Sequence, residues 1–149
     1  MPRIVRAMKS DGQYPLVAAS KNALGAVIGG GRNDDLPGDA NALVRPKSGG
    51  MSVSPTWRDL PGHRIPRRLR ALCPKATGND LMDCWQFGDG PFTDGTVASS
   101  LSLRTDQLTH GVVEPSREMP AQEYQAALAA TRENWNLVPE TVRTNEALA

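Results

Sequence analysis

Short stretches in which apolar and polar residues alternate recur along the chain, and this period of two is typical of β-strands with one buried face. The first stretch, residues 3–8, ends at a Ser10-Asp11-Gly12 turn. Residues 51–53 and 101–103 alternate in the same way, and the short segments 42–44, 81–87 and 109–113 are further candidate strands. We therefore expect sheets built from strands of only a few residues.

A helical period stands out near the C-terminus. Pro120 suits the first turn of a helix, and Glu123 suits the positive end of its dipole. We expect Trp135, at the end of this stripe, to lie in the core rather than to serve as a ligand platform. The apolar stripe runs at helical spacing through Tyr124, Ala127, Leu128, Thr131 and Trp135.

Two shorter helical segments are expected elsewhere. Residues 18–27 are a candidate helix with Ser20 as its N-cap, ended by the glycines that begin at Gly29. Residues 67–72 are expected to form one or two helical turns. Segment 29–40 is expected to be a mobile loop because it is polar, acidic and rich in glycine. Its glycines do not form a phosphate-binding P-loop, since the Lys-Ser/Thr pair is missing.

Together these elements predict an α+β fold of mostly antiparallel sheets with a C-terminal helix. The length of 149 residues suits a single domain with a hydrophobic core of its own. We expect that domain to span residues 1–149, with an ordered core at about 3–138 and a polar tail at 139–149.

Composition limits the compartment in which we expect the protein and the metal or thiol chemistry that it can carry. The chain has no apolar run near the ~18 residues of a membrane span and no apolar signal at its start, so we expect a cytoplasmic protein. Cys73 and Cys84 are too far apart for a structural zinc motif, and the only histidines are His63 and His110. We therefore expect no metal site and two reduced, partly buried thiols.

The strongest charge feature is a basic segment at residues 58–70. Its neighbour Trp57 is the only aromatic residue nearby, whereas sites for nucleic acid usually interleave basic residues with stacking aromatics. With a net charge of only +1, the favoured interpretation is a solvated face or a docking surface for an acidic partner. The basic residues of the segment are Arg58, His63, Arg64, Arg67, Arg68 and Arg70.

Residues 46–54 carry the most informative chemistry. Gly49 and Gly50 let the backbone approach a ligand closely because no Cβ stands in the way. Ser52 and Ser54 follow them, and their hydroxyls can donate and accept hydrogen bonds at a pocket wall. An ordinary hairpin turn with polar residues on its wet face is the alternative interpretation.

His110 begins the last predicted strand. A lone histidine at a strand end is usually structural, and it gains a functional interpretation if it faces the hydroxyls of residues 46–54. Ser52 and His110 would also suit a hydrolase. However, the Gly-x-Ser-x-Gly turn is absent and no acid is evident to orient the histidine, so this interpretation is not favoured.

Four features follow one another between residues 3 and 136. In this order and spacing they resemble the Tse-two type of type VI secretion toxin, a family whose fold is related to ADP-ribosyltransferases. The features are Arg6-Ala7-Met8-Lys9-Ser10-Asp11-Gly12, Gly49-Gly50-Met51-Ser52-Val53, Ile65-Pro66, and the series His110, Pro115, Met119 and Trp135.

This resemblance implies a toxin that acts in the cytoplasm and is held inactive by a cognate antitoxin or immunity protein. It also implies an ADP-ribosyltransferase-like fold with NAD as cofactor. Arg6 would anchor a phosphate or ribose, with Lys9 and Gly50 beside it in the cofactor site. Ser52 would bind the nicotinamide ribose or fix the pocket wall, and His110 would act as a hydrogen-bond donor or acid–base group, so these two are the catalytic candidates.

The chain departs from the family pattern in its acidic residues. A typical ADP-ribosyltransferase has a carboxylate on a late strand that stabilises the ribose cation, within a Glu-x-Glu or Gln-x-Glu pair. That pair is absent here, and Glu114 is the only acid on the last predicted strand. Met51 also replaces a small polar residue, and residues 71–100 have no clear counterpart. The acid of the site therefore stays open.

Two other functions remain open. One is a non-catalytic interaction protein that docks an acidic partner through residues 58–70. The other is an RNA 2′-phosphotransferase-like enzyme on the same fold, in which Arg6, Arg45 and His110 converge on a phosphate. Its affinity for RNA would fall steeply with salt.

Overall fold

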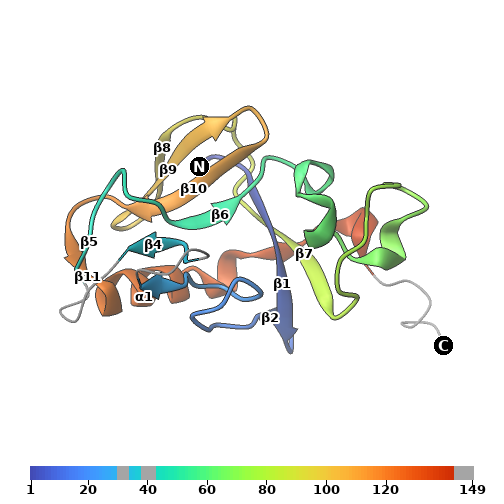
Figure 1. Ribbon diagram of the computed structural model, residues 1–149, viewed down its shortest axis with the longest axis horizontal. Helices are drawn as coiled ribbons and strands as arrows, with labels where there is room; N and C mark the ends of the chain where they lie inside the picture. The colour runs from blue at the N-terminus through green and yellow to red at the C-terminus, as the bar shows by residue number, and fades with distance from the viewer. Residues whose placement is uncertain (30–33, 38–42, 143–149) are drawn as a thin grey trace.

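The computed structural model describes residues 1–29, 34–37 and 43–142, and its two largest sheets are four-stranded and antiparallel (Figure 1). No helix in these ranges is long and apolar enough to cross a membrane. The first sheet has the order β12 (Asn136–Leu137), β7 (Met82–Phe87), β1 (Ile4–Asp11) and β2 (Tyr14–Pro15). The second has the order β6 (Met51–Val53), β10 (His110–Pro115), β9 (Leu101–Gln107) and β8 (Gly95–Ala98).

Smaller elements complete the fold. β5 (Leu43–Val44) pairs antiparallel with β11 (Met119–Pro120), and β3 (Ile28–Gly29) pairs parallel with β4 (Leu36–Pro37). The predicted α+β class, with mostly antiparallel strands and a C-terminal helix, is confirmed. The helical elements are α1 (Ala121–Ala129) and the 3-10 turns Trp57–Asp59, Gly62–Arg64, Arg67–Leu69, Arg132–Asn134 and Pro139–Thr141.

Strand β1 links the two sheets. Its residue Val5 forms a bridge with Ser54, just after β6, through N–H to carbonyl bonds of 2.7 and 3.0 Å. Ile4 and Met8 on one face of β1 belong to the larger hydrophobic cluster, and Val5 and Ala7 on the other face belong to a second cluster. The expected half-buried strand is therefore buried on both faces.

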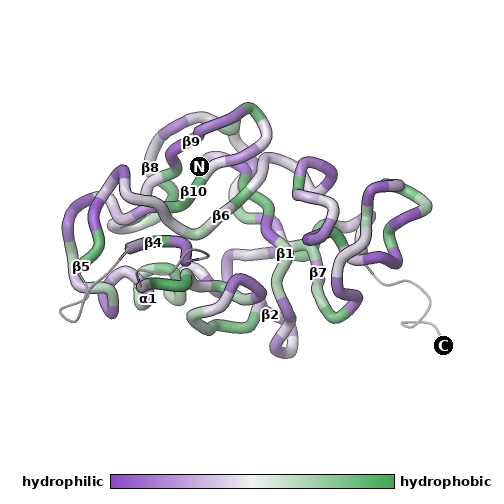
Figure 2. The backbone as a smooth tube through the Cα atoms, in the orientation of Figure 1, coloured by the Kyte–Doolittle hydropathy of each residue, from purple (hydrophilic) through white to green (hydrophobic). Residues whose placement is uncertain are grey.

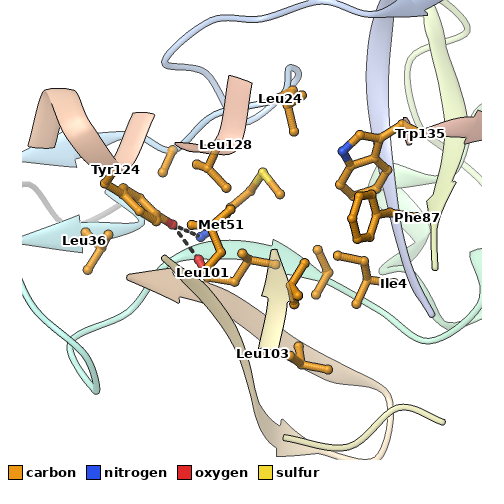
Figure 3. Packing of buried hydrophobic residues seen from close by; sticks show 14 of the residues in the cluster. Ile4, Leu24, Leu36, Met51, Phe87, Leu101, Leu103, Tyr124, Leu128 and Trp135 are labelled. Atoms are coloured by element: carbon orange, nitrogen blue, oxygen red, sulfur yellow. Dashed lines mark hydrogen bonds between the residues drawn. The ribbon is translucent and has the colours of Figure 1, made fainter. Parts of the chain in front are cut away.

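The larger cluster lies between α1 and the inner face of the second sheet, where Tyr124 and Leu128 join Leu101 and Leu103 (Figure 3). At its other end the rings of Phe87 and Trp135 pack with their centroids 5.4 Å apart. The prediction that Trp135 lies in the core is confirmed, since it is 3% exposed. The helix itself is shorter than its apolar stripe and ends before the 3-10 turn at Arg132–Asn134.

Two local predictions are wrong. Residues 18–27 form bends and turns rather than a helix, and the reason is given with the site below. β5 and β6 flank Gly49 and Gly50 but do not form a hairpin, since each pairs with a different strand. At the start of the predicted tail, the turn Pro139–Thr141 packs against the rest of the protein, and Thr141 is 1% exposed.

Other predictions meet the structure as follows. The loop predicted at residues 29–40 and the tail from residue 143 fall largely outside the described residues. Cys73 and Cys84 are buried free thiols, as expected, and burial raises the pKa of Cys84 to about 12. The turn predicted within residues 67–72 is present at Arg67–Leu69.

We predict that Tyr124→Phe lowers the free energy of unfolding by about 1–3 kcal/mol. The buried Tyr124 hydroxyl accepts the Met51 N–H at 3.1 Å and donates to the Val113 carbonyl at 2.5 Å, so it bridges β6 and β10 (Figure 3). The variant removes both of these hydrogen bonds. Urea unfolding measures the loss.

Tyr14→Phe is the matched control, because the half-buried Tyr14 contacts Arg132 through its ring, which phenylalanine keeps. Its free energy of unfolding should stay within about 0.5 kcal/mol of the wild type. Equal losses in the two variants would contradict the assigned bridge.

Candidate functional site

A pocket of about 300 Å³ lies where β1 meets β6. Its volume is at the lower end of the range for small-molecule sites, about 300–1,000 Å³. Both histidines of the chain line it, together with two serines and four charged residues. The polar lining residues are Arg6, Lys21, Asp35, Ser52, Ser54, His63, Arg64 and His110.

Arg6 is the most buried charge of the pocket, at 4% exposed. It lies on the face of β1 that also carries Ile4 and Met8, and its guanidinium is held by backbone carbonyls rather than by an acid. The acceptors are the carbonyl oxygens of Ala23 at 3.1 Å, Ser52 at 2.9 Å, Ser20 at 3.2 Å, Lys21 at 3.2 Å and Gly25 at 3.3 Å.

These bonds explain why residues 18–27 are not helical. In a helix, the carbonyls of Ser20, Lys21 and Ala23 would accept N–H groups four residues later along the chain. Here they turn toward Arg6 instead. The Ser20 hydroxyl, predicted to cap a helix, accepts the Asn22 N–H at 3.0 Å and so closes a turn.

One hydrogen of Arg6 remains available to a ligand. Nη1 carries two hydrogens, and within the described part of the chain its one acceptor is the Ser52 carbonyl. Burial and the nearby Arg64 lower the pKa of Arg6 to about 10, while Asp35 opposes this shift. The guanidinium therefore remains charged at neutral pH, although its cost of burial is high.

Arg64 places a second guanidinium beside the first. Its Nη1 donates to the Asn22 side chain at 2.7 Å, and its Nη2 donates to the Ala7 carbonyl at 3.3 Å and to the Lys21 carbonyl. Burial lowers its pKa below the ordinary value. With Lys21, the pocket holds three cations against one carboxylate, Asp35, so it favours an anionic ligand.

Ser52 and His110 enter the pocket from neighbouring strands. Ser52 pairs with Val112, two residues after His110, so the two side chains lie diagonally across β6 and β10. His110 Nδ1 lies 2.7 Å from Asp106 Oδ1. A carboxylate therefore orients this imidazole, and when Nδ1 carries the proton, Nε2 is left as a base.

Lys9 and Gly50, the other two predicted cofactor residues, do not line the pocket. Lys9 lies three positions after Arg6 on β1, and side-chain alternation puts it on the opposite face of the strand. Gly50 has a packing role, since a Cβ there would lie 2.3 Å from the Val113 carbonyl oxygen of β10. Of the predicted site residues, Arg6, Ser52 and His110 are the three that the pocket brings together.

Most of the basic segment 58–70 is engaged within the protein, although hydrophilic residues recur along it (Figure 2). Arg58 pairs with Glu140 at 2.9 Å, Arg68 pairs with Asp83 at 2.9 Å, and Arg70 donates to the Ala76 carbonyl at 3.4 Å. Arg64 lines the pocket and donates hydrogen bonds there. Four of the segment's arginines therefore take part in hydrogen bonds within the protein, while Arg58, Arg67 and Arg70 remain exposed.

Sequence reasoning missed several of the lining residues. Lys21 and Asp35 lie in segments without periodicity, and His63 and Arg64 were read as part of a surface. Asp106 had a usable signal, because it stands four residues before His110 across the tight turn that joins β9 and β10. No group of three or more histidine, cysteine or acidic residues suited to a metal occurs in the described ranges.

Comparisons with known proteins do not assign the chain to a family. No model of a known protein family matches the chain, and no curated protein does either. The resemblance to the toxin family therefore stays a prediction carried by the motifs and by the residues that meet in the pocket.

We predict that Arg6→Met lowers the free energy of unfolding by about 3 kcal/mol or more, because five backbone carbonyls lose their shared donor. Arg67→Met makes the same chemical change at an exposed position and should cost no more than about 0.5 kcal/mol. Urea unfolding compares the two. A wild-type midpoint for Arg6→Met would show that these bonds contribute nothing to stability.

Proposed function

We propose that the chain is a cytoplasm-acting toxin with an NAD-binding, ADP-ribosyltransferase-like site that a cognate antitoxin or immunity protein neutralises. The observation that carries the proposal is the meeting of Arg6, Ser52 and His110 in one pocket. The motifs that contain them are far apart in the sequence, and the toxin-like pattern assigned all three to one cofactor site. Two antiparallel sheets joined at β1 and β6, with the pocket at the junction, suit the same proposal.

The charges of the pocket indicate how NAD would lie. Lys21, Arg64 and the remaining Nη1 hydrogen of Arg6 offer donors to a phosphate. A dinucleotide is larger than a pocket of about 300 Å³, so one nucleotide half lies inside and the other extends over the rim. We assign the nicotinamide half to the inside, where Ser52 and His110 reach the ribose.

The chemistry is cleavage of the bond between nicotinamide and ribose. His110, oriented by Asp106, takes the proton of the attacking water or target hydroxyl. Ser52 holds the ribose through its hydroxyl. ADP-ribose then passes either to a macromolecular target or to water.

A second candidate is an RNA enzyme that acts on a phosphate ester. It is favoured by the presence of both histidines beside Lys21 and Arg64, since paired acid–base groups with cations suit phosphate chemistry. Arg45, expected to contribute, is instead exposed, pairs with Glu118 and does not line the pocket. The interaction-protein alternative rests on Arg58, Arg67 and Arg70, which are exposed, although four of the five arginines of residues 58–70 also contact the protein itself.

We predict that induced expression arrests bacterial growth and lowers cellular NAD, and that Ser52→Ala relieves both effects. Ser52→Ala is a clean variant because the Arg6 bond uses the backbone carbonyl of Ser52, which alanine keeps. Ser99→Ala, at an exposed serine outside the pocket, should remain as toxic as the wild type. Growth curves and total NAD at equal soluble expression provide the measurement.

The outcomes of this experiment distinguish the NAD-dependent toxin from the RNA enzyme. Growth arrest at constant NAD, together with RNA binding that weakens steeply with salt, would favour the RNA enzyme. No arrest by soluble wild-type protein would contradict the toxin proposal. Full toxicity of Ser52→Ala would contradict the assigned pocket.

A further inference from the structure

Glu114, the one acid on the last predicted strand, is not at the pocket. Glu114 on β10 is 7% exposed, accepts the Arg104 Nε at 2.7 Å and the Lys47 N–H at 3.0 Å, and does not line the pocket. Its charge is neutralised by Arg104. Glu114 therefore stabilises the connection between β9, β10 and the turn before β6, and another residue must supply any acid of the site.

Asp35 is the one carboxylate among the lining residues. It precedes β4 and reaches the pocket from a segment that the toxin-like motifs do not include. Its side chain is 4% exposed. Oδ2 accepts the Val27 N–H at 2.8 Å, and Oδ1 accepts from Lys21 Nζ at 3.2 Å.

These two bonds leave acceptor capacity on the Asp35 carboxylate. Each carboxylate oxygen has two lone pairs, so Oδ1 and Oδ2 can each accept a further hydrogen bond. The Val27 bond also fixes the carboxylate in place before a ligand arrives, which is the condition for efficient electrostatic stabilisation. Asp35 is thus both positioned and able to accept.

The charge of Asp35 acts on the rest of the pocket. Burial lowers the pKa of both Arg6 and Arg64, and the Asp35 charge opposes that lowering, so Asp35 lies close enough to influence both guanidinium groups. The pocket therefore presents a negative group among its cations. A ligand with an anionic phosphate and a ribose that becomes positive during reaction matches that arrangement.

We propose that the Asp35 carboxylate accepts a hydrogen bond from a hydroxyl of the nicotinamide ribose and stabilises the positive charge that develops on that ribose. This inference rests on the proposed function. The bond between C1′ and the nicotinamide nitrogen breaks, and both electrons go to the nitrogen, which leaves as neutral nicotinamide. Water or a target hydroxyl then forms the new C1′–O bond, and its proton passes to His110.

A purely structural role for Asp35 gives a different pattern of effects. As an anchor, Asp35 would serve only to hold Val27 and Lys21, and its substitution would reduce stability and ligand binding together. Asp35→Asn removes the charge but keeps an oxygen that can accept the Val27 N–H. A loss of turnover without a loss of binding therefore separates the two roles.

The experiment compares Asp35→Asn with the wild type and with Asp34→Asn, the same change at the neighbouring residue, which does not line the pocket. Nicotinamide release from NAD, NAD affinity by calorimetry and the melting temperature are measured. We expect turnover by Asp35→Asn to fall about 100-fold or more, its NAD affinity to change less than about threefold, and Asp34→Asn to match the wild type.

A deoxy analogue gives a test that does not depend on folding of the variant. NAD lacking the 2′-hydroxyl, or the 3′-hydroxyl, of the nicotinamide ribose is offered to the wild-type protein. The rate enhancement over the uncatalysed reaction should fall about 100-fold for one of the two analogues. Asp35→Asn should show no comparable further loss, because the hydroxyl and the carboxylate act as one pair.

Three results would overturn the proposal. Turnover of Asp35→Asn within threefold of the wild type would remove Asp35 from the reaction. Parallel losses of turnover, affinity and melting temperature, with no response of the wild type to either analogue, would leave Asp35 as a structural anchor. A folded wild-type protein that neither binds nor cleaves NAD would reject the proposed function itself, and the proposal with it.

Discussion

The buried guanidinium of Arg6 is the interaction on which the fold and the pocket both depend. It lies on the central strand β1 and donates to carbonyls of residues 20–25 and to the carbonyl of Ser52 on β6. A buried charge is costly unless its donors are satisfied, so the loop must present its carbonyls inward and cannot become a helix. The same bonds hold β6 against β1 at the junction of the two sheets.

The contacts of Arg6 with this loop and with β6 also shape the pocket. Lys21 belongs to the loop whose carbonyls contact Arg6, and Arg64 belongs to the 3-10 turn Gly62–Arg64. The Lys21 carbonyl accepts hydrogen bonds from both guanidinium groups. The resulting excess of cations favours an anion, and Asp35 offsets part of their mutual repulsion. Arg6 thus serves the site mainly by shaping it, so its substitution tests stability more directly than ligand binding.

The sequence patterns predict the local elements better than the site. Alternation identified β1, and apolar segments bounded by glycine or proline identified β7 and β10, because each strand buries its own apolar residues; the helical stripe placed Trp135 in the core. The helix predicted at residues 18–27 was wrong because the carbonyls of this segment bond to Arg6, which is distant in sequence. Carbonyl acceptors leave no trace in side-chain patterns, and Asp35 meets the pocket only through tertiary contacts, so neither was foreseeable.

The two histidines allow the central claim, that this pocket binds NAD, to be measured directly. Their imidazole resonances can be followed by NMR during an NAD titration, with His63→Ala and His110→Ala giving the assignments. Because both rings line one pocket, both signals should shift and saturate with a single dissociation constant. If NAD binds while both signals stay unchanged, or if NAD does not bind the folded protein, the account is contradicted.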